Sequence, residues 1–420
     1  MENSLIKTLV NLRGNARACV YTEPLWGLSL NLCIPYASIY MLALGLNDGQ
    51  VGLVATVYML SQVVSAFFSG PIVDKMGRRK AIALSDLIAW SLPCIFWLKA
   101  EGFWFFFVAA LLNGTMQISL TAFDCLTIED VEKKQVTGIQ SLIVVSGQLS
   151  VLFAPISAIL FSRLTLVPAI RILYINAFIV MNIKIVLLYI FSRESKVGLV
   201  RIEECRGKSI FSLAAGYRGI IKIIGRSRGT IFAIIISTLA GIVAMINTTF
   251  WQVIVSKKLL VPDHLLPLAP ILKSVIAIIF LFLIAPHLTR KGVLKFPLLL
   301  GFGCYLVGQI LLINAPPEGP EKYIILCISL IFDSFGFGNL MMLSRSLVAL
   351  HSNPIERARI MAIVNMIIMA IIAPFGWIGG LLSNISRNLP FVLNLCILFL
   401  GVCITLIYYR KNTGTADYTM

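Results

Sequence analysis

Charged side chains are scarce in this sequence. They make up 13% of the 420 residues, whereas a soluble globular domain carries about 25%. Apolar residues reach 58%, and the mean hydropathy is +0.91. So few charges cannot cover the surface of a water-soluble fold of this length. The composition therefore excludes an ordinary soluble enzyme and indicates an all-α integral membrane protein.

Groups that carry chemistry are also few. The sequence has three histidines, far apart, and its nine cysteines show no C-x-x-C spacing. Most cysteines lie inside apolar runs, where they act as small hydrophobic residues. We find no metal-ligand cluster, no nucleophile–base set and no phosphate-binding loop. The sequence therefore predicts no enzymatic activity, no metal and no cofactor.

Basic residues exceed acidic ones, 35 to 19, for a net charge of +16. They cluster between apolar runs and are not spread over a surface, which argues for membrane topology and against nucleic-acid binding. Twelve apolar runs are long enough to span a bilayer, which needs about 20 residues each. These predicted spans are 24–45, 51–70, 80–98, 103–126, 138–162, 168–191, 229–255, 265–287, 296–314, 323–350, 359–383 and 390–409.

The loops fix the orientation of these spans. On the side of the two termini we count 25 Lys/Arg, against six in the opposite loops and four within spans. Because basic residues resist translocation, we expect both termini in the cytoplasm. The longest connection, 192–228, holds nine Lys/Arg. It divides the chain into an N-terminal bundle (1–191), a basic linker (192–228) and a C-terminal bundle (229–420).

One short stretch between the second and third spans has a defined pattern. Two glycines, one acid and four bases lie in it, and we interpret it as a turn that glycine allows to be sharp. Its patterned residues are Gly70, Asp74, Lys75, Gly77, Arg78, Arg79 and Lys80.

This stretch resembles the loop that follows the second helix in the major facilitator superfamily (MFS), a family of secondary transporters. The resemblance implies two pseudo-symmetric bundles of six helices that alternate access to a site between them. It also implies that Asp74 is a gating residue whose partner is the start of the eleventh helix, near Arg359.

A weak internal repeat agrees with this architecture. The segment 285–295 aligns with the patterned stretch and puts Gly292 on Gly77, 215 residues later. Thr289 replaces the acid of the first copy. Similarly, Ala154-Pro155 in the fifth span matches Ala373-Pro374 in the eleventh.

Polar side chains inside spans are the candidate functional residues, because leaving them unpaired in lipid is costly. In the family, the first, fourth, seventh and tenth helices line the central cavity. The alternative is that these side chains form hydrogen bonds between helices of one bundle. The candidates for binding substrate or a proton are Asn31, Asn113, Gln117, Asn247, Gln252, Lys273 and Asp333.

Asp333 is the candidate with the most specific chemical role. It lies about ten residues into its span, or roughly 15 Å along a helix at 1.5 Å per residue, near the bilayer centre. We expect it to bind a cationic or hydroxylated substrate or to exchange a coupling proton; the alternative is a structural pair with Lys273. Lys184 is interpreted as structural or interfacial, and Asp86 and Asp124 as part of the charge network around Asp74 and Arg78.

The resemblance to the family favours the first of three functions. The first is efflux of an amphipathic or drug-like solute across the cell membrane by a monomeric transporter. The fourth span lacks the arginine that drug–proton antiporters of the family often carry, and this weakens that prediction. The second is uptake of a small polar solute such as a sugar by proton symport, favoured by the Asn/Gln side chains. The third is a non-transporting membrane sensor built on a transporter fold.

Overall fold

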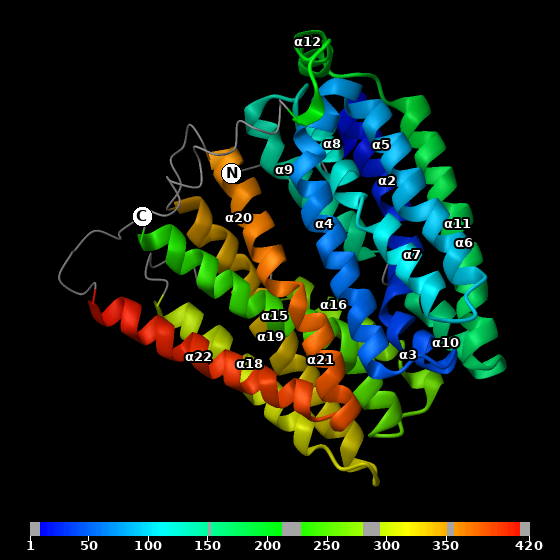
Figure 1. Cartoon of the computed structure of the whole chain (residues 1–420), viewed down its shortest axis with the longest axis vertical. Helices are drawn as coiled ribbons and strands as arrows, with labels where there is room; N and C mark the ends of the chain where they lie inside the picture. Colours follow the sequence, from blue (N-terminus) through cyan, green and yellow to red (C-terminus); the bar gives the residue numbers. More distant parts are fainter. Residues whose placement is uncertain (1–8, 150–152, 212–227, 280–294, 351–356, 412–420) are drawn as a thin grey trace. The chain divides into compact units, whose positions relative to one another are not determined.

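The computed structural model describes residues 9–149, 153–211, 228–279, 295–350 and 357–411, and every regular element in these ranges is helical (Figure 1). Within these ranges, ten helical segments are long and apolar enough to cross a membrane. The predicted spans 138–162 and 265–287 are the two outside this set, because each runs into residues that are not described. The all-α membrane fold is confirmed, with ten of the twelve expected spans.

The chain divides into two compact units. The first comprises residues 1–46 and 57–217, and the second comprises residues 47–56 and 218–420. The first unit contains most of α4 (Asp48–Met76) and the helices α2 (Gly14–Asn31), α3 (Ala37–Ala43), α5 (Arg78–Asp86), α6 (Leu92–Leu98), α7 (Phe103–Asn113), α8 (Met116–Ile128), α9 (Lys133–Leu149), α10 (Ala154–Arg163), α11 (Leu166–Phe191) and α12 (Lys196–Glu204).

The second unit contains the remaining helices and the first turns of α4. These helices are α15 (Arg228–Lys257), α16 (Leu268–Ile279), α18 (Lys295–Asn314), α19 (Glu321–Leu350), α20 (Arg357–Ile372), α21 (Pro374–Ile385) and α22 (Leu389–Lys411). The second copy of the repeat, 285–295, lies outside the described residues except for Lys295.

Several predicted spans are broken helices. The first begins ten residues earlier than expected, at Gly14, and is interrupted at Ile34–Tyr36, where Pro35 cannot continue the hydrogen-bond ladder. The eleventh is interrupted at Ala373, just before Pro374. The third contains a five-residue π-helical turn, Leu87–Ser91, between α5 and α6. Such turns let a helix re-aim its side chains without ending.

The patterned stretch at 70–80 is not the turn that the sequence predicts. α4 continues through Gly70 and Pro71 to Met76, and α5 begins at Arg78. Only Gly77 separates the two helices, with a φ of +85° that favours glycine. A Cβ at Gly77 would also lie 2.7 Å from a Glu194 carboxylate oxygen. One glycine thus makes the whole connection.

The first turns of α4 pack closely on α21, which explains their place in the second unit. Asp48 Oδ2 accepts a hydrogen bond from Ser383 Oγ at 2.5 Å and lies 3.6 Å from the Arg387 guanidinium. Thr56 Oγ1 donates to the Ala373 carbonyl at 2.7 Å. A Cβ at Gly380 would lie 2.6 Å from the Asp48 carbonyl, so the backbones meet directly.

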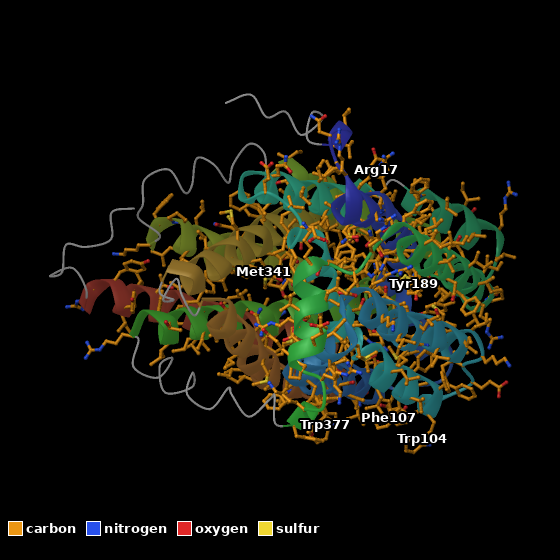
Figure 2. All side chains as sticks on the ribbon, turned by 90° about the horizontal axis from the view of Figure 1, so that it is seen from above. Arg17, Trp104, Phe107, Tyr189, Met341 and Trp377 are labelled. Atoms are coloured by element: carbon orange, nitrogen blue, oxygen red, sulfur yellow. The ribbon has the colours of Figure 1, made fainter. Side chains whose placement is uncertain are left out.

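Apolar and aromatic side chains cover the outside of the units. On α7, Trp104 and Phe107 project outward beside each other (Figure 2), and Trp104 is 70% exposed. Their ring centroids are 5.5 Å apart. Exposed aromatic and aliphatic side chains are expected where the neighbour is lipid and not water.

Glycine contacts between α18 and α19 give a first prediction. A Cβ at Gly336 would lie 2.7 Å from the Tyr305 backbone nitrogen and 2.9 Å from the Gly301 carbonyl. Because backbone cannot yield, we expect Gly336→Ala to destabilise the protein by about 1–3 kcal/mol. Thermal unfolding in detergent measures this loss.

Gly303→Ala is the matched control for that prediction. A Cβ at Gly303 meets nothing within 4 Å, so this variant should unfold at the wild-type temperature or slightly above it. Equal stability of the two variants would contradict the tight packing of α18 on α19.

Candidate functional site

The patterned stretch forms a network of charges within the first unit. The Arg78 guanidinium is buried and lies 3.1 Å from Asp74 and 3.0 Å from Glu129, to which it also donates through Nε. Arg79 donates to the Tyr189 carbonyl at 2.9 Å and lies over the Tyr189 ring. Glu129, at the end of α8, is therefore the main acidic partner of Arg78.

Glu194 completes this network from the segment that follows α11. Its carboxylate accepts hydrogen bonds from the backbone N–H groups of Arg78 at 2.8 Å and Arg79 at 3.1 Å. These N–H groups belong to the first turn of α5 and have no partner within the helix. A carboxylate is also favoured there by the helix dipole. Next to it, the Ser195 hydroxyl hydrogen-bonds Glu129 and caps α12 at the Gly198 N–H.

The remaining residues of the stretch are peripheral to this network. The Lys75 ammonium donates to the Lys208 carbonyl at 3.2 Å, and Lys80 is exposed. The sequence missed Glu129 and Glu194, since both lie at helix ends where carboxylates are common. The expected partner of Asp74 near Arg359 falls within 357–362, whose side chains lie outside the described residues.

The polar candidates of the first unit are engaged in hydrogen bonds between helices. Asn113 donates to the Ala89 carbonyl at 2.6 Å, and Gln117 donates to Gln62 Oε1 at 2.6 Å. Asn31 donates to the Gly147 carbonyl at 3.4 Å. These contacts agree with the alternative interpretation of the Asn/Gln side chains, in which they hold one bundle together.

In the second unit the structure joins two of the candidates through a residue that the sequence did not single out. Gln309 Nε2 lies 3.0 Å from both carboxylate oxygens of Asp333 and 3.3 Å from Asn247 Oδ1. Asn247 donates to the Tyr305 hydroxyl at 2.9 Å, and Asn394 donates to Gln309 at 2.9 Å. Asp333 is 3% exposed, so this cluster is sealed inside the unit.

Lys273 is not the ion-pair partner of Asp333. Within the described ranges no ion pair joins the two, and the Lys273 ammonium lies instead 4.7 Å from the centre of the Trp251 ring. Trp251 borders an apolar cavity of about 250 Å³ between α15, α16 and α19. The remaining candidate, Gln252, is buried on α15.

A charged cavity in the first unit holds side chains that the sequence assigned elsewhere. The Lys184 ammonium lies 2.7 Å from Asp86 Oδ2, and Ser119 hydrogen-bonds the other oxygen of Asp86. Lys184 is 3% and Asp86 2% exposed. The sequence placed Asp86 in the network around Arg78. The structure shows that Asp86 pairs with Lys184 instead.

The cavity beside this pair has a volume of about 120 Å³. Two further carboxylates, Glu23 and Asp124, line it with Asp86 and Lys184. Its walls are aromatic and apolar: Trp26, Trp90, Met116, Leu120, Phe123 and Ile143. The Trp26 and Trp90 rings meet edge to face at 6.2 Å. Sequence reasoning missed Glu23 because the predicted span begins at Pro24, which leaves Glu23 just outside it.

The family is decided by a match over most of the chain. The family model of the Major Facilitator Superfamily matches residues 26–317. The chain belongs to this superfamily of membrane transporters. This confirms the resemblance that rests on Gly70, Asp74 and Gly77.

Individual relatives are more distant. An 88-residue segment is 31% identical to the uncharacterized MFS-type transporter YqjV of Bacillus subtilis (strain 168), and it spans 21% of this chain and 21% of that protein. A mutant of the nucleoside transporter NupG superposes with a TM-score of 0.74 at 14% identity, covering 94% of this chain and 99% of NupG. A POT family transporter crystallised with a thioalcohol-conjugated peptide gives 0.71 at 14% identity, covering 96% of each chain. These structures share the fold of this MFS protein.

The Glu194 cap gives a second prediction. Glu194→Gln removes the negative charge and one of the two oxygens that accept from the start of α5. We expect faster hydrogen exchange at the Arg78 and Arg79 amides and a stability loss of about 1 kcal/mol. Hydrogen exchange followed by mass spectrometry reports the first effect, and thermal unfolding reports the second.

Glu203→Gln on α12 is the control, because Glu203 is exposed on a neighbouring helix. It changes the same charge without touching α5. If the α5 amides exchanged hydrogen equally fast in the two variants, Glu194 would not be the cap of α5.

Proposed function

We propose that this MFS protein exports amphipathic organic cations across the cell membrane by alternating access. The observation that carries the proposal is the charged cavity of the first unit, with three carboxylates, one lysine and aromatic walls. Carboxylates attract a cation, and indole and phenyl faces add cation–π attraction to its apolar substituents. A volume of about 120 Å³ holds roughly four waters or one substituted ammonium group.

The direction of transport follows from the physics of such a solute. A lipophilic cation crosses a bilayer unaided, and a membrane potential that is negative inside favours entry by about 2.3 kcal/mol per 100 mV. A carrier is not needed for its accumulation, but one is needed for its removal. Export requires an energy source, and we assign this role to a proton gradient.

Asp333 fits the role of proton carrier better than that of substrate ligand. Its carboxylate is 3% exposed and is held by Gln309 inside the second unit. A cargo molecule needs a cavity, whereas a proton needs only an acceptor and a hydrogen-bonded path. The cluster around Gln309 offers such groups in Asn247 and Tyr305.

Uptake of a small polar solute is the weaker candidate. It rests on the Asn/Gln side chains, but Asn113 and Gln117 are engaged between helices. The network around Arg78 supports a moving transporter over a passive sensor, because it has the parts of a gate. We place this network and both termini in the cytoplasm and treat the protein as a monomer.

The test compares a cation with a neutral molecule of the same shape. Benzyltrimethylammonium is the cation, and neopentylbenzene, with carbon in place of the charged nitrogen, is the neutral control. At about 100 times its dissociation constant, a bound ligand stabilises the folded state by roughly 2.7 kcal/mol. We expect that stabilisation with the cation and not with the neutral control, in thermal unfolding of the purified protein.

Variants locate the binding. Glu23→Gln should weaken cation binding, while Glu101→Gln, which alters an exposed loop residue, should leave it unchanged. Asp333→Asn should bind the cation normally, but proteoliposomes carrying it should no longer drive export with a proton gradient. Stabilisation by a sugar or nucleoside that survives Glu23→Gln would instead establish uptake. No stabilisation by any solute would favour the sensor.

A further inference from the structure

The Lys184–Asp86 pair is unusual because it borders a cavity instead of being sealed in a core. Lys184 comes from α11 and Asp86 from α5, and both are among the residues that line the cavity. An ion pair with only a structural role gains little from such a place, since well-packed apolar residues of similar volume are often as stabilising. Its position beside the other carboxylates calls for a different explanation.

The charges around the cavity are unequal. Three carboxylates, Glu23, Asp86 and Asp124, face one ammonium, Lys184. The lining thus has two more acidic than basic side chains. Glu23 has no hydrogen bond or ion pair among the described residues. The Lys184 ammonium also lies 5.6 Å from the centre of the Phe123 ring. The Lys184 ammonium is itself a cation, and it already contacts a carboxylate and an aromatic ring of the kind that would bind a cationic cargo.

We propose that Lys184 is a tethered competitor of the transported cation and thereby sets its affinity. In the empty site, the Lys184 ammonium neutralises Asp86. The cargo and Lys184 then share the three carboxylates, and their mutual repulsion keeps binding weak enough for release. No covalent bond changes; only ion pairs and hydrogen bonds exchange. The proposal rests on the proposed transport of cations.

Removal of the competitor gives the decisive result. Charges about 5 Å apart interact strongly even at a protein-like effective dielectric constant. We therefore expect Lys184→Met to bind benzyltrimethylammonium at least about tenfold more tightly than wild type and to transport it more slowly, because release becomes limiting. Lys184→Arg keeps the charge and should keep the wild-type Kd. A merely structural lysine predicts the opposite, namely weaker binding in Lys184→Met.

Lys184→Met leaves Asp86 buried without its counter-ion and is at risk of not folding. The double variant Lys184→Met/Asp86→Asn removes both charges, retains Glu23 and Asp124, and is expected to fold. It should bind the cation at least as tightly as wild type and turn over more slowly. Weaker binding than wild type, or wild-type turnover, would overturn the proposal.

The two levels of the hypothesis fail differently. If wild type binds benzyltrimethylammonium but Lys184→Met does not bind it more tightly, or the double variant binds it more weakly, only the role of Lys184 is wrong. If wild type does not bind the cation at all, the proposed function is wrong and the role of Lys184 falls with it. Equilibrium binding to detergent-solubilised full-length protein, followed by flux in proteoliposomes, measures both quantities.

Discussion

The hydrocarbon core of a membrane offers no hydrogen-bond partner, and the interior of this protein is organised by that constraint. Each polar side chain in a span must be satisfied by another part of the chain. Asn113 therefore turns toward the Ala89 carbonyl, and Asp333 toward Gln309. Apolar side chains fill the rest of the interior, and those left over, such as Trp104, face outward.

The two units resolve the constraint in different ways. In the second unit, the Gln309 amide of α18 holds Asp333, and the Asn394 amide of α22 holds Gln309 in turn. In the first unit, Lys184 neutralises Asp86, and a cavity with two more carboxylates lies beside the pair. A sealed carboxyl group suits proton exchange, whereas a cavity with excess negative charge suits a cation. This difference underlies the division of roles that we propose.

The network around Gly77 depends on residues that lie far from it in the sequence. A one-residue connection brings the end of α4 and the start of α5 together, and this leaves the first N–H groups of α5 without helical partners. The Glu194 carboxylate, more than a hundred residues later, accepts hydrogen bonds from these N–H groups. The bases of the pattern matter less as loop charges than as partners: Arg78 holds Asp74 and Glu129 together.

The sequence by itself determined the membrane fold, the family and most of the spans, because these depend on long apolar runs and one local pattern. It also marked Asp333 as buried, since a carboxyl group in mid-span has few alternatives. Only the tertiary structure decided the partners. Gln309 and not Lys273 meets Asp333, and Lys184 rather than Arg78 meets Asp86. Helical periodicity tells which residues share a face of one helix, but not which neighbouring helix that face meets. That choice depends on packing between segments far apart in the chain, which no local pattern encodes.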